Sequence, residues 1–241
     1  MFKKVVVASD FHVPFQDDKA VGYFLRYIKE YKPNLLVING DFLDMYSLSD
    51  FERNPDRSNT LQEDLDRGYD LLKQIRQAVG KKCEILILEG NHEARLQRYI
   101  WRNKELNGMN CLNLSTLLDL KSLNISFIGA SRDYWREKVG HYKVGDVTIM
   151  HGDTRLNGAA TSKYSGYSAK NTMYNINSSI IIGHCHRLAQ VYATTPQETL
   201  IGMECGCLCQ RTGIANWQQG FVTFELNPNI TNPQLHFINN H

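Results

Sequence analysis

The sequence has little that would mark a membrane-spanning, disordered or strongly basic protein. No apolar run approaches the roughly 20 residues that a membrane-spanning helix needs. The 27 Lys and Arg nearly balance the 25 Asp and Glu, so the net charge of +2 gives no overall attraction to nucleic acid or to an anionic membrane. No Pro/Ser-rich linker or repeat divides the chain. We therefore expect one domain over residues 1–241, with 42% hydrophobic residues to fill its core.

We also expect no export signal at the N-terminus. The short apolar run after Lys3 and Lys4 breaks at Ser9-Asp10, which is too early for the core of a signal peptide. Without export, a disulfide framework is not expected. We therefore predict a cytoplasmic protein without a membrane partner, and reduced thiols at all six cysteines, which are Cys83, Cys111, Cys185, Cys205, Cys207 and Cys209.

The first half of the chain alternates strand-like and helix-like segments. Short apolar runs at Lys4–Ala8, Leu35–Ile38 and Ile85–Leu88 predict buried strands. Between them, Ala20–Tyr31 and Leu61–Val79 repeat apolar residues at the spacing of an amphipathic helix. This order predicts a largely parallel sheet covered by helices, in the α/β class.

The second half of the chain is richer in short β-segments. The sequence Val144-Gly145-Asp146-Val147 predicts a tight hairpin turn, and Ile180–Ile182 predicts another buried strand. Further strand-like segments follow, at Gln190–Ala193, Thr199–Met203, Phe221–Leu226 and Leu235–Phe237.

Polar residues with ligand chemistry follow five of these predicted strands. Their blocks are Asp10-Phe11-His12, Gly40-Asp41-Phe42-Leu43-Asp44, Gly90-Asn91-His92-Glu93, His151-Gly152 and Gly183-His184-Cys185-His186. The carboxyl ends of neighbouring strands in such a sheet converge on one edge, where ligands bind. We therefore expect these side chains to gather at one place.

Carboxylate, amide and imidazole donors together suit Mn, Fe, Zn, Ni or Mg rather than a thiolate-selecting ion. The five blocks hold more of these donors than one metal ion can bind. Two metal ions about 3.5–4 Å apart that share a carboxylate would make use of them. Such a pair holds a bridging water or hydroxide and stabilises the charge that develops during displacement at phosphorus. The pattern therefore favours hydrolysis of a phosphate ester.

The five blocks, in type and order, resemble those of the calcineurin-like metallophosphoesterase superfamily, in particular its compact phage and bacterial members. The resemblance implies two mixed β-sheets packed face to face with helices outside. It implies a first metal site of Asp10, His12 and His186, a second of Asn91, His151 and His184, and Asp41 as the bridge between them. His92 would face the substrate, stabilise the phosphoryl oxygens and protonate the leaving group. We expect two divalent ions, with manganese first and iron, zinc or nickel as alternatives.

Protein serine/threonine phosphatases of this superfamily carry Gly-Asp-x-x-Asp-Arg-Gly, whereas Met45-Tyr46 follows Asp44 here. That difference argues against this branch. Three interpretations stay open: a phosphoesterase acting on phosphomonoesters or phosphodiesters, a nuclease or nucleotide phosphodiesterase with the same metals, and a non-catalytic protein-binding scaffold. Non-catalytic scaffolds of this superfamily typically lose metal ligands or the substrate-facing histidine. The implied ligands and His92 are all present here, which disfavours the scaffold. The segment Trp101–Arg136 is a candidate small lid over the site.

The residues around the blocks carry weaker predictions. We expect Asp44 to support a ligand histidine. Glu93 either supports the metal ligands in the same way or complements the dipole of the helix that follows it, and we prefer the second interpretation. Among the basic residues that flank the later histidines, Arg187 is our candidate for contact with a substrate phosphate; the others are Arg155, Lys163 and Lys170.

Several further residues are interpreted as structural. The residues Cys205-Gly206-Cys207-Leu208-Cys209 have no zinc-finger spacing, and we interpret them as small, buried strand residues beside the metal loops. Arg95, Arg98 and Arg102 fall on one face of a predicted helix, which we interpret as solvated. The histidines outside the blocks are expected to lie at the surface or to be satisfied in the core; they are His141, His236 and His241.

Overall fold

The computed structural model describes residues 3–50, 54, 56–57, 59–129, 131–132, 137–138, 140–153, 162–211 and 216–239. Its first sheet has six strands in the order β13-β12-β1-β2-β3-β4. These strands are β1 (Lys3–Ala8), β2 (Leu35–Asn39), β3 (Glu84–Leu88), β4 (Ile125–Ile128), β12 (Gly220–Leu226) and β13 (Ile230–Phe237). Strands β1 to β4 are parallel, whereas β12 pairs antiparallel with β1 and with β13.

The second sheet has five strands in the order β10-β11-β9-β8-β7. They are β7 (His141–Val144), β8 (Val147–Met150), β9 (Ser179–Ile182), β10 (Leu188–Thr194) and β11 (Thr199–Cys205). The three central strands are parallel, and the two edge strands pair antiparallel. The predicted hairpin therefore joins β7 and β8. A separate small ribbon pairs β5 (Ser131–Arg132) with β6 (Glu137–Lys138).

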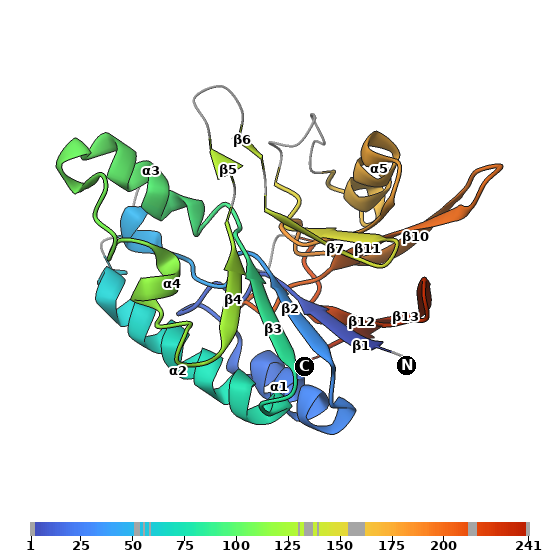
Figure 1. Cartoon of the computed structure of the whole chain (residues 1–241), viewed down its shortest axis with the longest axis horizontal. Coiled ribbons are helices and arrows are strands. Elements are labelled where there is room, and N and C mark those ends of the chain that lie inside the picture. Colours follow the sequence, from blue (N-terminus) through green and yellow to red (C-terminus); the bar gives the residue numbers. More distant parts are fainter. Residues whose placement is uncertain are drawn as a thin grey trace.

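The helices lie outside the two sheets (Figure 1). They are α1 (Asp18–Tyr31), α2 (Leu61–Val79), α3 (Ala94–Arg102), α4 (Leu114–Leu117) and α5 (Tyr167–Ile176), with 3-10 turns at η1 (Tyr46–Leu48) and η2 (Lys104–Leu106). The α1 helix begins where the Asp17 carboxylate accepts two backbone N–H bonds, and α2 begins with a capping box between Thr60 and Glu63. Among the described residues, no helix has the length and apolar character needed to cross a membrane.

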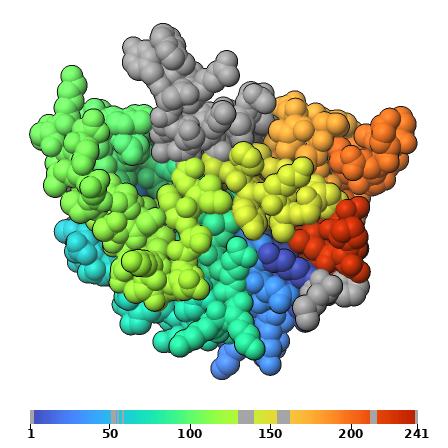
Figure 2. Space-filling model, in the orientation of Figure 1, coloured from blue at the N-terminus to red at the C-terminus, as the bar shows by residue number. Residues whose placement is uncertain are grey.

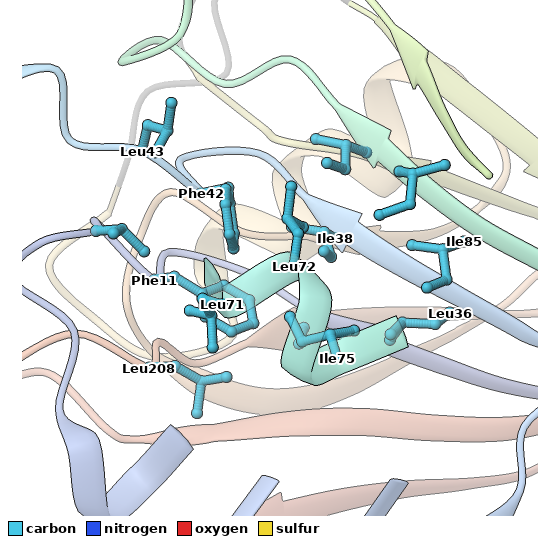
Figure 3. Close-up of a cluster of buried hydrophobic side chains, with 14 of the residues drawn as sticks. Phe11, Leu36, Ile38, Phe42, Leu43, Leu71, Leu72, Ile75, Ile85 and Leu208 are labelled. Carbon is cyan, nitrogen blue, oxygen red and sulfur yellow. The ribbon is translucent and has the colours of Figure 1, made fainter. Parts of the chain in front are cut away.

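Alternation along the buried strands of the first sheet fills two separate cores. One face of β1 and β2 places Val6 and Leu36 against α1 and α2, in the cluster that also holds Phe24 and Leu72. Figure 3 shows part of this cluster, with Phe11, Phe42 and Leu208 from the loops packed beside the strands. Because successive side chains of a strand point to opposite faces, the other face is left for a second core.

That second core lies between the sheets. Val5 and Val37 from the first sheet pack in one cluster with Ile149 and Ile181 from the second. A third cluster, with Ile180 and Met173, joins the outer face of the second sheet to α5. The result is a helix–sheet–sheet–helix arrangement, so the predicted fold of two mixed sheets flanked by helices is confirmed.

The central place of β1 connects the two halves of the chain. In the space-filling view, the dark blue N-terminal strand lies between the red C-terminal residues and the lighter blue segment (Figure 2). The register pairs Val6 with both Thr223 of β12 and Leu36 of β2. The loop after β1 is therefore fixed from both sides, which gives the residues that follow it a rigid support.

Much of the segment 101–136 belongs to the main body of the protein. Strand β4 completes the first sheet, and Leu114, Leu118 and Leu120 lie in the core beneath α2. Residues 130 and 133–136 lie outside the described part of the chain. The lid therefore stays a prediction, and it concerns only the exposed portion of this segment.

Candidate metal centre

The five predicted blocks meet at the ends of β1, β2, β3, β8 and β9. Direct bonds between the loops hold them together: the backbone N–H of Asp10 donates to the carbonyl of Gly40, and the N–H of His12 donates to the carbonyl of Asp41. The Asn39 side chain donates to the carbonyl of Met150, which ties the first sheet to the second. The site therefore lies on the seam between the two sheets.

The residues predicted to hold the first metal lie in contact with one another. The Asp10 Oδ1 is 3.1 Å from His186 Nε2 and 3.8 Å from His12 Nε2. The two imidazole Nε2 atoms are themselves only 3.1 Å apart. All three residues are buried. Three ligand atoms therefore point at one small volume.

The residues predicted to hold the second metal form an adjacent cluster. The His151 Nε2 lies 3.1 Å from Asp41 Oδ2 and 3.1 Å from the Asn91 side-chain oxygen. The His151 ring packs edge-on against His184, with centroids 5.2 Å apart. Asp41 Oδ2 is also 3.8 Å from His12 Nε2, so Asp41 lies between the two clusters, where a bridging ligand must lie.

His92 lies beside these clusters, at the side of Asp41. Its Nε2 is 3.8 Å from Asp41 Oδ2, and its Nδ1 lies 2.9 Å from the Asp44 carbonyl. Since a carbonyl can only accept, the Nδ1 carries the proton, and Nε2 is left toward the pocket. The Arg95 guanidinium lies 3.3 Å from that Nε2 and also donates to the Asp44 carbonyl.

Asp44 is placed as a support for His12. Its Oδ2 lies 3.0 Å from His12 Nδ1, the ring nitrogen opposite the one that faces Asp10. Such a carboxylate fixes the orientation of an imidazole ligand and raises its basicity. The arginines predicted on one face of α3 do not share one role. Arg95 contacts Asp44 and His92, whereas Arg102 pairs with Asp50 at the surface. Sequence reasoning therefore missed Arg95.

The preferred prediction for Glu93, that it complements the dipole of α3, is wrong, and the alternative of support for the metal ligands agrees with the structure. Its side chain makes no capping bond to α3, and its buried carboxylate instead accepts backbone N–H bonds from Asp41 at 3.0 Å, Leu43 at 2.8 Å and Gly90 at 2.9 Å. Glu93 therefore clamps the loop after β2 to the loop after β3. Burial, followed by the nearby charge of Asp41, raises the pKa of Glu93 to about 7.

Several of the predicted ligands have left-handed backbone conformations, which L-residues other than glycine rarely adopt. They are Asp10 at φ 56°, His12 at 51°, Asp41 at 50°, His184 at 61° and His186 at 55°. The neighbouring glycines leave room for this close approach. A Cβ on Gly90 would overlap the Asp41 carboxylate, and one on Gly183 would overlap the Ser9 hydroxyl.

The charges of the cluster are strongly coupled. Burial opposes ionisation of Asp10 and Asp41, but the positive charges of His186 and His151 outweigh it and hold the pKa of each carboxyl well below its usual range. In turn, although burial opposes their charge, these carboxylates raise the pKa of His186 to about 9 and that of His151 to about 10. Burial, then repulsion from His151, lowers the pKa of His184 to about 4.

The donor set fits divalent metal ions. Among the described residues, Asp10, His12 and Asp41 offer ligand atoms within 4.8 Å of one another, and so do Asp41, His151 and His184. The buried Asp10 Oδ1 makes no hydrogen bond of good geometry, although His186 Nε2 lies 3.1 Å away, and a metal ion between these two donor atoms would satisfy both. Oxygen and imidazole donors of this kind suit first-row divalent ions.

A pocket of about 370 Å³ opens above the clusters. Its floor is formed by predicted ligands and by His92. Its walls come from residues that carry no ligand pattern in the sequence: Phe15, Arg57, Gln210, Arg211 and Trp217. The Trp217 ring packs edge-on against His186, with centroids 4.2 Å apart. No motif in the sequence would have identified these wall residues, because they come from three separate loops.

Arg187 does not line this pocket. Its guanidinium is buried, donates to the carbonyl of Ser162 and has its Nε 3.9 Å from the Glu204 carboxylate. It lines instead a smaller neighbouring pocket of about 290 Å³, which shares His184 with the main one. Contact between Arg187 and a substrate phosphate therefore stays a prediction. Arg155 lies outside the described residues.

The six cysteines are free in the structure, and Cys205, Cys207 and Cys209 are buried. The prediction that they continue one strand is wrong, because β11 ends at Cys205 and Gly206 turns the chain at φ 77°. The turn brings Cys209 Sγ to 3.8 Å from His186 Nδ1. His236 is half-buried, stacked on Phe221 with its Nε2 2.8 Å from the Thr223 hydroxyl, and His141 is exposed; His241 lies outside the described residues.

Known proteins share this sequence pattern. A model of the calcineurin-like phosphoesterase family matches residues 3–202. The Gene 54 proteins of Mycobacterium phages L5 and D29 are each 26% identical to the chain, and each match covers 98% of the chain and 93% of the phage protein.

Solved structures show a similar arrangement at low identity. A metallophosphoesterase from Sphaerobacter thermophilus is 14% identical, with a TM-score of 0.48 over 99% of this chain and 89% of that one. Vps29 from Entamoeba histolytica, in a structure described as complexed with zinc, is 13% identical, with a TM-score of 0.42 over 98% of this chain and 99% of that one.

Proposed function

Because the chain belongs to the calcineurin-like phosphoesterase family, we propose that it is a two-metal hydrolase of phosphomonoesters or phosphodiesters. The observation that carries the proposal is the position of Asp41. Its carboxylate lies within 3.8 Å of His12, His92 and His151, between two groups of ligand atoms. A single carboxylate so placed can serve both ions of a dinuclear centre.

The proposed metal ligands are those that the sequence predicted. Asp10, His12 and His186 would hold one ion, Asn91, His151 and His184 the other, and Asp41 both. When bound, the two divalent ions would activate water and neutralise the charge that develops on the phosphoryl group. We propose manganese as the resident metal; iron, zinc and nickel suit the same donors. The free cysteines support a cytoplasmic location.

The residues of the chain would hold and orient the ester. His92, fixed through its Nδ1–H to the Asp44 carbonyl, keeps Nε2 toward the pocket. When Nε2 is protonated as well, the imidazolium can stabilise a phosphoryl oxygen or deliver that proton to the leaving oxygen, which leaves Nδ1–H in place. Arg95 holds that ring in place from the other side. Asp44 orients His12.

The test is hydrolysis of bis(4-nitrophenyl) phosphate beside 4-nitrophenyl phosphate by metal-stripped protein reloaded with manganese. We expect turnover of at least one ester, lost in Asp41→Asn. His92→Ala should keep its metals and turn over at least about a hundredfold more slowly. His141→Ala is the matched control, because His141 is exposed and lines a different pocket. Two bound metals without turnover of either ester would contradict the proposal and favour a protein-binding scaffold.

A nuclease or nucleotide phosphodiesterase is the second candidate. Its chemistry would use the same ligands. The observation that favours it is the pair of pocket walls, which combine the aromatic rings of Phe15 and Trp217 with the cations of Arg57 and Arg211. Turnover of the diester well above that of the monoester would support it.

A further inference from the structure

The walls of the main pocket hold groups that hydrolysis of a phosphate ester does not itself need. About 370 Å³ lies within the usual size of small-molecule sites and leaves room for much more than a phosphate group. We propose that Trp217 and Arg57 form a nucleoside subsite, so that the substrate is a nucleotide or the terminal nucleotide of a single strand. This inference rests on the proposed phosphoesterase function and names its substrate class.

Trp217 is suited to stack a base because its backbone is held firmly. The neighbouring Gln218 donates its N–H to the His186 carbonyl at 2.9 Å, and its carbonyl accepts from the N–H of Cys207 at 3.1 Å. The indole is only partly buried, and its ring meets His186, a predicted ligand, edge-on. A face of the indole beside the reacting phosphate would contact the group that the phosphate carries. Stacking on such aromatic platforms does not depend on which base is present.

Arg57 provides a planar cation on another wall. Its guanidinium lies over the ring of Phe15 at 4.6 Å and over that of Tyr46 at 5.3 Å. These rings restrict its orientation although the residue is exposed. The turn that carries Arg57 is closed by its N–H on the Asn54 carbonyl at 3.0 Å. A guanidinium held in this way can bind a phosphate oxygen or stack on a base.

A second cation, Arg211, lines the same pocket. It follows Gln210, whose N–H donates to the Phe15 carbonyl at 2.9 Å, so the loops of Phe15 and Arg211 are joined. The two guanidinium groups of Arg57 and Arg211 therefore lie on the walls of a pocket whose floor holds the predicted metal ligands, and they can neutralise the charge of a bound phosphate. A flat aromatic group beside several anionic oxygens is the chemistry of a nucleotide.

A free nucleotide and the end of a nucleic-acid strand share this chemistry. The neighbouring pocket distinguishes these two substrates, because only the strand is long enough to reach it. It is lined by Lys163, His184 and Arg187, among others, and it meets the main pocket at His184. Lys163 lies over the ring of Tyr164 at 5.2 Å, and that ring is exposed. A strand that leaves the main pocket past His184 would meet this pair, whereas a mononucleotide would not.

The test compares adenosine 5′-monophosphate with ribose 5-phosphate, two ligands that differ only in the base. Their binding is measured by calorimetry on manganese-loaded protein in the His92→Ala background, where turnover is slow. We expect the nucleotide to bind at least about tenfold more tightly. Trp217→Leu should remove that difference and Trp217→Phe should keep most of it. The control is Trp101→Leu, at an exposed tryptophan of α3.

Equal binding of the two ligands by the Trp217-containing protein would overturn the inference, even if the Trp217 variants failed to fold. Equal weakening of both ligands by Trp217→Leu would also overturn it, since that is the mark of a merely structural role. A Trp217-dependent preference for the nucleotide, without turnover of any ester, would support the subsite while the phosphoesterase proposal failed. Turnover of simple esters without any preference for the base would do the reverse.

A 5′-phosphorylated tetranucleotide identifies the source. If Lys163→Ala weakens the tetranucleotide by several-fold and leaves adenosine monophosphate unchanged, the substrate is a nucleic-acid end. If it changes neither, the substrate is a free nucleotide. Both results support the nucleoside subsite.

Discussion

The buried carboxylate of Glu93 offers a sharp test of how the metal loops are held. Glu93→Ala removes the acceptor of three backbone N–H groups, from Asp41, Leu43 and Gly90, which lie in a buried part of the structure. Leaving such a donor unpaired costs about 1–2 kcal/mol, so three of them give about 3–6 kcal/mol. In a chain of this size that corresponds to a fall in melting temperature of roughly 6–24 °C.

Glu93→Gln should cost less, because an amide keeps one oxygen. That oxygen can replace Oε2, which accepts from both Asp41 and Gly90, while the NH₂ group then faces the N–H of Leu43. We expect about 2 kcal/mol for this single lost bond and the donor–donor contact.

The assay is chemical denaturation of the metal-free and manganese-loaded forms, with metal content measured alongside. Glu30→Ala, at an exposed position of α1, is the control and should stay within about 0.5 kcal/mol of the parent. Both Glu93 variants should also retain less metal, since Glu93 positions Asp41. A Glu93→Ala protein as stable and as metal-rich as the parent would refute the reasoning that this carboxylate clamps the two loops.

Three further predictions concern the same site. Asp41→Asn should lower the affinity for both metal ions, whereas His92→Ala should leave the metal content at two ions per chain. Elemental analysis after dialysis measures the metal content of both variants, and an equal loss of metal from the two would contradict the assigned roles. The folded-state pKa of His151 is raised to about 10 in the metal-free chain, so this imidazole is protonated at neutral pH and must lose its proton to bind a metal. Metal uptake should therefore release protons and become weaker as the pH falls. Calorimetry in buffers of different ionisation enthalpy measures the proton release, and no release at pH 7 would contradict the charge assigned to His151. Gly183→Ala should destabilise the protein by about 2 kcal/mol or more, because the added Cβ overlaps the Ser9 hydroxyl, and a melting temperature equal to that of the parent would show that the loop relaxes freely.

The sequence was most informative where local pattern decides the structure. The helix predicted at Leu61–Val79 has those bounds, and that predicted at Ala20–Tyr31 begins two residues earlier, at Asp18, directly after its Asp17 cap. The strands at Leu35–Ile38 and Ile85–Leu88 each differ by one residue. Because parallel strands end at a common edge, the residues after them were predicted to meet, and Asp10, Asp41 and His151 do.

What the sequence could not predict depends on contacts between distant segments. Strand β12 pairs with β1 across more than two hundred residues, which no local pattern encodes. Glu93 was misjudged for the same reason, since two of its three donors lie some fifty residues earlier in the chain. Arg57 and Trp217 have no motif, and only the folded chain brings them to one pocket.

The left-handed backbone at the ligand positions carries a free-energy cost that depends on the side chain. The left-handed conformation costs a residue with a Cβ on the order of 1 kcal/mol more than it costs glycine. Five ligand positions adopt it: Asp10, His12, Asp41, His184 and His186. Glycine at any one of them would relieve the backbone strain, but it would also remove the buried bonds of the side chain, such as the one from the His184 N–H to Asp10 Oδ2. All five instead carry a carboxylate or an imidazole. The strained positions of this backbone are therefore also the positions that bring carboxylates and imidazoles together at the seam between the two sheets.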